Sequence, residues 1–196
     1  EEITVIKLLD YMGSDNLIAN IARLSVAEDG SWNDLPEGYT EARRDGLLYY
    51  LALHQHSSPF RHSCISIKGK VPLFIARQLG KHQVGLTWNE KSMRYRESPE
   101  MYIPSVWRDA GDSLKQGSGG PADEAKQKFA KDIYECVVDV TTTAYDMLLD
   151  RGICREQARM VLPQSMYVEF VWTGSLTAFA HVFTLRSKED AQLEVQ

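Results

Sequence analysis

The sequence predicts an α+β fold in a single domain, with a mostly antiparallel sheet packed against long helices. Stretches with strand-like alternation are separated by helical patterns of very different length. Strand and helix do not succeed one another regularly, as a doubly wound sheet would require. The 196 residues suffice for one domain with a real core and make only a weak case for two. We therefore treat residues 1–196 as one domain.

The N-terminal part is expected to begin with a strand followed by a helix. Residues 3–8 read as the opening strand, and residues 15–24 have helical spacing. Ser14 or Asp15 is the expected N-cap of this helix, because both side chains accept hydrogen bonds from free amide groups. Residues 27–38 have the composition of a loop.

A second helix and a second strand follow. Residues 40–55 predict a helix that ends before Pro59, and its expected apolar side consists of Leu47, Leu48, Leu51 and Leu53. Residues 62–68 alternate in the manner of a strand. Pro72 then opens another helix, since proline is tolerated in the first helical turn.

The C-terminal half contains one long helical pattern. Residues 111–120 are rich in glycine and serine and predict a mobile loop. Residues 122–151 predict a long amphipathic helix that stops at Gly152. Its apolar positions recur every three or four residues, at Phe129, Ile133, Val137, Val140, Ala144 and Leu148.

Shorter elements complete the chain. Residues 154–161 predict a short helix, residues 167–172 a strand, and Ser175 the start of a further helix that runs through Phe183. Residues 187–190 suit the cap of a final helix. Because the sequence stops six residues later, we expect that C-terminal helix to be incomplete.

Composition excludes several classes of function. A net charge of −5 argues against broad nucleic-acid binding, which needs a basic face. No apolar run is long enough to cross a bilayer, and no secretory segment opens the chain, so we expect no membrane association. Cys64, Cys136 and Cys154 are odd in number and lack Cys-x-x-Cys spacing, which suits free thiols in the cytosol.

The most informative segment is residues 78–95. It combines amide, ammonium, imidazole, carboxylate, hydroxyl and guanidinium groups directly after an apolar helix pattern. Lys81 and Arg94 could hold a phosphate, and Gln78 and Ser92 could hydrogen-bond the edge of a polar ring. The pattern is typical of a phosphorylated, flat ligand, but a polar turn that caps two helices would also explain it.

Residues 88–95, Trp-Asn-Glu-Lys-Ser-Met-Arg-Tyr, resemble the signature of the flavin-dependent thymidylate synthases. The Arg-His-Arg triplet of that family reads Lys81-His82-Gln83 here, the following spacer is one residue longer, and Arg61 stands where glutamate is usual. Further elements of the family occur in the right order, at residues 22–25, 56–62, 76–78, 158–163 and 185–186. The resemblance runs from about residue 19 to residue 192, nearly the whole chain.

The resemblance implies a defined reaction. The family converts dUMP to dTMP, with methylenetetrahydrofolate as the carbon donor and with FAD that NADPH reduces. It works as a homotetramer whose active sites lie where subunits meet. The altered triplet removes one charge and two guanidinium forks, so the resemblance also implies weaker retention of FAD here.

The resemblance assigns individual site residues. The dUMP contacts that it implies are Gln78, Lys81, Glu90, Ser92, Met93, Arg94, Arg159 and Arg186. The FAD contacts that it implies are Ser58, Lys81, His82, Gln83, Glu90, Ser175, Thr177 and His181. No Gly-x-Gly-x-x-Gly follows a strand, so the flavin is not expected to bind in the Rossmann manner.

Arg186 is the predicted catalytic residue, because the resemblance places it at the pyrimidine ring. Carbon C5 of the ring attacks only when electron density can build up on its carbonyl groups and N3, and a guanidinium at that edge stabilises the developing charge. The alternative is a surface arginine at a helix junction. Arg155 and Arg159 lie four residues apart and could likewise form only salt bridges.

Other chemistries receive less support. Ser92 has no neighbouring base that would make it a nucleophile. His54, His56 and His62 match no standard metal-ligand pattern, so we expect no metal. Two rival functions stay open: a sibling enzyme that transfers a different one-carbon group to a pyrimidine nucleotide, and a non-catalytic nucleotide-binding homologue.

Overall fold

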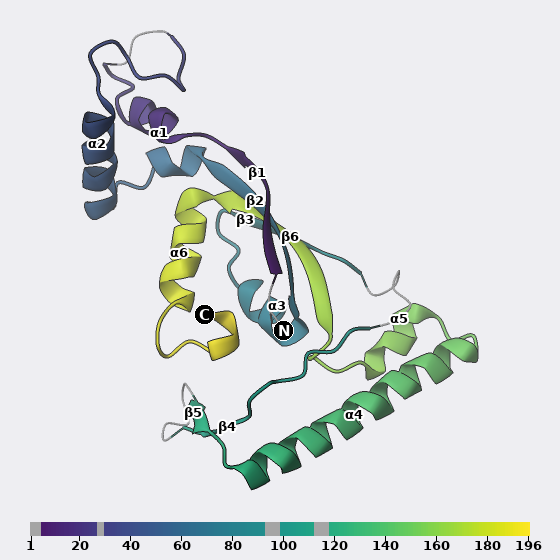
Figure 1. The fold of residues 1–196 in the computed structure, drawn as a ribbon. Coiled ribbons are helices and arrows are strands. Elements are labelled where there is room, and N and C mark those ends of the chain that lie inside the picture. Colours follow the sequence, from purple (N-terminus) through teal and green to yellow (C-terminus); the bar gives the residue numbers. More distant parts are fainter. Residues whose placement is uncertain (1–4, 27–29, 93–98, 112–117) are drawn as a thin grey trace.

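The computed structural model describes residues 5–26, 30–92, 99–111 and 118–196, and it confirms the α+β class. A four-stranded antiparallel sheet, in the order β1-β2-β6-β3, forms the centre of the molecule (Figure 1). Its strands are β1 (Val5–Met12), β2 (Cys64–Pro72), β6 (Tyr167–Ser175) and β3 (Leu86–Glu90). A separate two-stranded sheet pairs β4 (Arg108–Ala110) with β5 (Ser118–Pro121).

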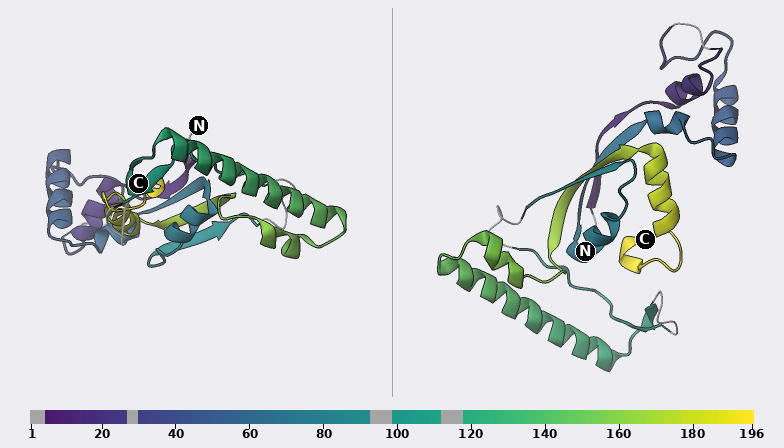
Figure 2. Two further views of the ribbon diagram at one scale, coloured as in Figure 1. Left: turned by 90° about the horizontal axis from the view of Figure 1, so that it is seen from below. Right: turned by 180° about the vertical axis from the view of Figure 1, so that it is seen from behind.

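The helices lie at both ends of the sheet and beside it. In Figures 1 and 2, α1 and α2 lie at one end, and α4 and α5 lie at the opposite end. The bounds are α1 (Asp15–Ala22), α2 (Glu41–Leu53), η1 (Pro59–His62), α3 (Leu73–Leu79), α4 (Glu124–Asp150), α5 (Arg155–Ala158), η3 (Arg159–Val161), α6 (Leu176–Arg186) and η4 (Leu193–Val195).

Strand β6 pairs with β2 on one side and with β3 on the other. Its residues alternate between buried and partly exposed positions along its whole length. Val168, Phe170 and Trp172 point into the core, where Ile75 of α3 and Val182 of α6 meet them. Burial of such side chains contributes roughly 1.5–3 kcal/mol each. The core therefore fixes α3 and α6, which carry several predicted site residues, against one face of the sheet.

Trp88 packs against this core. Its ring stacks on Phe170 with a centroid distance of 4.0 Å and packs edge-on against Trp172. Strand β3, which carries Trp88, was not predicted. Its alternation of Leu86 and Trp88 with polar residues is a strand signal, but it was interpreted only as a ligand-binding motif.

The predicted helix starts and stops are largely confirmed. Ser14 caps α1 by accepting from the amide of Leu17 at 3.1 Å, and Ser175 caps α6 in the same way. The long helix α4 ends at Asp150, and Gly152 follows with a φ of +79°, a left-handed conformation that glycine adopts without strain. Local capping chemistry thus determines these boundaries.

Four details of the prediction were wrong. Leu53 of α2 is 62% exposed, and only Leu51 of that apolar side is buried. Residues 118–120 of the expected mobile loop form part of β5, because they pair with β4, while residues 112–117 lie outside the described residues. The opening strand extends to Met12, since it pairs with β2 as far as Cys64.

The fourth error concerns the expected C-terminal helix. Residues 187–191 form bends and a turn, and only the three-residue 3-10 helix η4 follows. Gln192 and Glu194 hydrogen-bond to side chains elsewhere in the chain. These long-range contacts outweigh the local helix propensity, which is a weak influence over so few residues.

The apolar stripe of α4 is present, but it faces outward from the chain. Phe129 is 69% exposed and Val140 is 62% exposed, and Ile133 and Val137 are also exposed. A neighbouring flank of the helix packs on its own chain through Tyr145, which is fully buried. Figures 1 and 2 show α4 well apart from α6, with α5 beside it.

Glu169 joins β6 to β2 through Lys68 and to the residue after β3 through Lys91. Its carboxylate lies 3.0 Å from Nζ of Lys68 and 3.1 Å from Nζ of Lys91, and these two hydrogen bonds hold its pKa at about 2. The group is therefore ionised in the folded protein wherever the pH lies above that value. It ties the chain just before Ser92 to the sheet.

We expect Glu169→Gln to lower the free energy of unfolding by roughly 1 kcal/mol at neutral pH, the scale of partly exposed ion pairs. Because folding depresses the pKa of Glu169, its stabilisation is complete above the ordinary value near 4.5 and is lost as the pH falls toward 2. Urea unfolding of both proteins between pH 7 and pH 3 measures this difference. A difference that grows as the pH falls would contradict the assignment.

Candidate functional site

The start of α6 gathers several residues of the predicted FAD set. Ser175 ends β6, and its hydroxyl accepts a hydrogen bond from the amide of Ala178 at 3.3 Å. Thr177 donates from Oγ1 to the backbone carbonyl of Ser57 at 3.3 Å. This bond ties the segment before η1 to α6, so that Ser58 lies close to the first turn of the helix.

The turn between α3 and β3 closes on the same helix. Gly85 has a φ of +73°, and a β-carbon built on it would lie 3.3 Å from Cβ of Ala178. Any larger residue would be strained there and would press against α6. The turn carries Lys81, His82 and Gln83, and it exposes the first and the last of these.

Arg186 lies at the other end of α6, where it meets two residues that the sequence had also singled out. Its Nε donates to Nε2 of His82 at 2.9 Å, and one terminal nitrogen donates to the backbone carbonyl of Gln78 at 3.2 Å. These residues are more than 100 positions apart in the sequence, so the fold brings together two separate motifs of the predicted site.

His82 is a neutral acceptor in this arrangement. Burial lowers its pKa, and electrostatic interactions with Arg186 and with His181 lower it further. Since Nε2 accepts the hydrogen bond from Arg186, the ring proton must reside on Nδ1. The positive charge of the pair therefore stays on Arg186.

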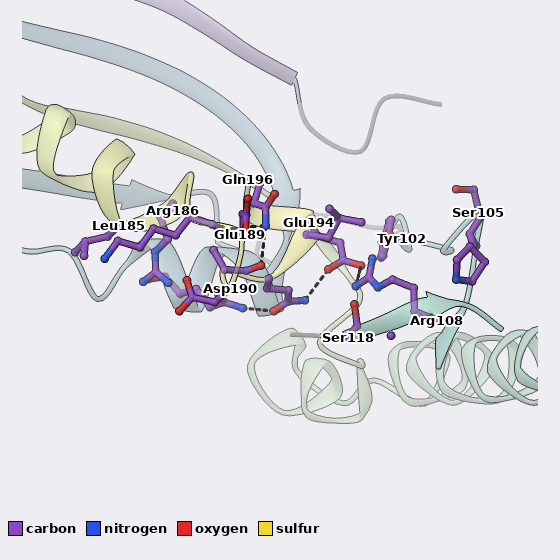
Figure 3. Close-up of a pocket in the computed structure, with 18 residues that line it drawn as sticks. Tyr102, Ser105, Arg108, Ser118, Leu185, Arg186, Glu189, Asp190, Glu194 and Gln196 are labelled. Carbon is purple, nitrogen blue, oxygen red and sulfur yellow. Dashed lines mark hydrogen bonds and ion pairs between the residues drawn. The ribbon is translucent and has the colours of Figure 1, made fainter. Parts of the chain in front are cut away.

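An open cavity of about 1140 Å³ begins beside Arg186 and Gln78. Figure 3 shows Arg186 and Leu185 on one side of it and Arg108, Tyr102 and Ser118 on the other. The C-terminal segment, residues 188–196, forms much of the wall between them. The volume is that of a site for a nucleotide or a molecule of comparable size.

Three residues of the cavity were missed by the sequence interpretation. Arg108 donates to Glu194 at 2.7 Å, and Glu194 also accepts from Gln192 at 2.9 Å (Figure 3). Gln192 in turn accepts a hydrogen bond from the side chain of Gln78. Residues 187–196 had been interpreted as a helix, and Arg108 lies in no motif, so no sequence signal pointed to them.

The remaining predicted residues are spread more widely. His181 lies on α6 near enough to influence His82, whereas Glu90 is exposed at the end of β3. Arg159 is exposed on η3, which packs against α4 and α5 and lies apart from α6 (Figure 1). Ser92 is partly buried. Met93 and Arg94 lie outside the described residues.

Three further features of the described residues concern metal ions, thiols and membranes. Over the described ranges, no group of three or more His, Cys, Asp or Glu side chains is arranged to hold a metal ion. The three cysteines are unpaired. No helix within the described part of the chain has both the length and the apolar character needed to cross a membrane.

Comparison with known proteins defines the class. Residues 7–196 match the sequence model of the family described as thymidylate synthase complementing protein. The chain therefore belongs to this family, whose curated members include enzymes named flavin-dependent thymidylate synthase. The resemblance drawn from the motifs is thereby confirmed.

Particular relatives are similar over almost the whole chain. The flavin-dependent thymidylate synthase of Thermosipho africanus is 35% identical over 97% of this chain and 80% of its own length. That of Kosmotoga olearia is 36% identical with the same coverage. A solved structure of the UMP/dUMP methylase PolB from Streptomyces cacaoi, bound with 5-Br dUMP, has a TM-score of 0.83 and 30% identity over 98% of this chain and 85% of that one.

Proposed function

We propose that this chain is a flavin-dependent thymidylate synthase that converts dUMP to dTMP. Methylenetetrahydrofolate is the proposed carbon donor, and NADPH is the proposed reductant of the bound FAD. The family membership supports this function, and so does the dUMP analogue bound to the structural relative. The observation that carries it is the meeting of Arg186 with Gln78 and His82 beside a cavity of suitable size.

In this proposal Arg186 polarises the pyrimidine. Methylation requires electron density to move through the ring toward C5 and onto the carbonyl oxygens, and a fixed guanidinium stabilises that density. Hydrogen bonds to His82 and to the backbone of Gln78 hold the guanidinium before substrate arrives, so little reorganisation is needed. Neutral His82 leaves the full positive charge available for the substrate.

The residues along α6 fit a flavin dinucleotide by their chemistry. Lys81 supplies a cation for the diphosphate, and His82 and Gln83 supply further polar groups beside it. The hydroxyl groups of Ser58 and Ser175 lie near the first turn of α6, at the end of that helix opposite Arg186. Bound there, FAD would supply the redox chemistry, while the chain positions and polarises the nucleotide.

We also propose that the active enzyme is a homotetramer with sites between subunits. Arg159 lies on η3, which packs against α4 and α5, and Figure 1 shows α5 apart from α6, so residues of two copies would together surround one nucleotide. The exposed stripe of α4 is apolar and lies on a helix of 27 residues, so it offers a long apolar surface that suits an interface. The unpaired cysteines support the proposed cytosolic location.

A second candidate is methylation of UMP, in which the same methyl group goes to the ribonucleotide. The structural relative is named as a UMP/dUMP methylase, and a second structure of it, bound with 5-Br UMP, has a TM-score of 0.79 and 29% identity. The two candidates differ only in tolerance of the 2′-hydroxyl group. Product analysis with each nucleotide distinguishes them.

Flavin spectroscopy tests the proposed function at the level of binding. We expect the purified protein to be yellow or to become so on adding FAD. Titration with dUMP should then perturb the flavin absorbance and saturate, and UMP should do so only at higher concentration. A protein that stays colourless at high FAD would contradict the function as an enzyme. Tighter binding of UMP than of dUMP would favour the second candidate.

A further inference from the structure

Four polar side chains in the cavity form a continuous hydrogen-bonded chain, which we call the amide relay. It runs from Arg108 to Glu194 at 2.7 Å, from Glu194 to Gln192 at 2.9 Å, and from Gln192 to Gln78. All four residues line the cavity that also contains Arg186. The relay thus joins β4 and the C-terminal segment to a predicted dUMP contact.

The charged end of the relay determines the direction of every hydrogen bond in it. A guanidinium only donates and a carboxylate only accepts, whereas an amide can do either. Burial raises the pKa of Glu194, but hydrogen bonds from Gln192 and the backbone, with the charge of Arg108, bring the pKa below its ordinary value. Glu194 is therefore an acceptor at neutral pH.

The orientation of both amides follows from this fixed end. Gln192 must turn its NH₂ group toward Glu194 and its oxygen toward Gln78. Gln78 must then turn its own NH₂ group toward Gln192. Its side-chain oxygen is left for a ligand, and among the residues that the structure describes this oxygen accepts no hydrogen bond.

We infer that the amide relay makes Gln78 a selective acceptor for the N3–H group of uracil, with Arg108, Glu194 and Gln192 as positioning residues. The inference rests on the proposed function, in which a uracil nucleotide binds beside Gln78 and Arg186. Uracil carries a hydrogen at N3, whereas cytosine has a bare lone pair there that would face the oxygen of Gln78. A freely turning amide could serve either base, so the relay supplies the discrimination.

The test compares dUMP with dCMP, because these nucleotides share phosphate and sugar. Calorimetry on the flavin-loaded protein gives the Kd of each, and the ratio measures base discrimination. We expect the wild-type protein to prefer dUMP. Gln192→Leu removes the hydrogen-bond partner of Gln78. It should reduce the preference for dUMP at least tenfold, mainly by raising the Kd of dUMP.

Glu194→Gln is the milder variant and decides the matter if the first does not fold. An amide in place of the carboxylate keeps the shape but can both donate and accept, so it releases the orientation of Gln192. The preference for dUMP should again fall. Glu37→Gln is the matched control, because it makes the same change at an exposed position outside the cavity lining, and it should leave the ratio unchanged.

The outcomes separate this inference from the proposed function. If the relay had only a structural role, its variants would weaken the binding of dUMP and of dCMP by the same factor. The inference is wrong, while the proposed function stands, if the wild type binds dUMP and both relay variants have the same ratio of dCMP to dUMP Kd as the wild type. The same holds if the wild type binds dUMP and dCMP equally well. A wild-type protein that binds neither nucleotide would contradict both.

Discussion

Replacing Arg186 with lysine should slow the reaction at saturating dUMP by roughly 10²–10³-fold, the usual effect of losing one preorganised donor in a transition state. Lysine keeps the positive charge. Its single ammonium lacks the planar fork that reaches Nε2 of His82 and the backbone carbonyl of Gln78 together. The cation would no longer be held at the pyrimidine edge, where charge develops during the reaction.

The effect should fall on the rate more than on nucleotide binding, since the charge that Arg186 stabilises is greater in the transition state. Single-turnover oxidation of reduced flavin, at saturating dUMP and folate, measures the rate, and a dUMP titration measures binding. Arg151→Lys is the control, because it makes the same substitution at an exposed position, the C-cap of α4. Full turnover in the Arg186 variant would refute its catalytic role.

Introducing a charge on the exposed stripe of α4 should have the other large effect. We expect Val137→Asp to dissociate the proposed tetramer, since an unpaired carboxylate buried in an interface costs several kcal/mol. If the sites lie between subunits, FAD affinity should fall with assembly. Light scattering and flavin titration over a range of protein concentrations measure both.

The matched control for this variant is Asp146→Lys. Asp146 follows Val137 by nine residues, which places it half a turn away on the exposed polar side of the helix. It should leave assembly and FAD affinity unchanged. If Val137→Asp assembles like the wild type, the apolar stripe of α4 is not the interface.

The sequence predicted those parts of the fold that local chemistry determines. Ser14, Ser175 and Gly152 mark helix ends because a cap or a left-handed turn depends on only a few neighbouring residues. A strand over residues 167–172 was also predicted from the local pattern, although the full length of β6 and its central position depend on pairing with β2 and β3.

The errors share a different cause. The C-terminal segment has helix-like composition, but its shape follows from Gln192 and Glu194 bonding to Gln78 and Arg108, partners far away in the sequence. The stripe on α4 was correctly recognised as apolar, yet periodicity cannot tell whether such a face meets its own chain or another.

The candidate site shows the same division. Motif resemblance identified Gln78, His82 and Arg186, and the fold brings them into contact. It could not identify Arg108, which lies 86 positions before its partner Glu194 and belongs to no motif. The roles assigned to Gln78, His82 and Arg186 in nucleotide and flavin binding stay predictions, as do those of Glu90, Arg94 and Arg159.

The most direct test of the proposed function follows the transferred carbon. The flavin-loaded protein is incubated with dUMP, NADPH and methylenetetrahydrofolate labelled with ¹³C at the methylene carbon, and the nucleotide product is analysed by mass spectrometry. The account predicts dTMP that carries the label in its methyl group, formed only when FAD and reductant are both present. Unchanged dUMP, or labelled product that forms equally well without flavin, would contradict it.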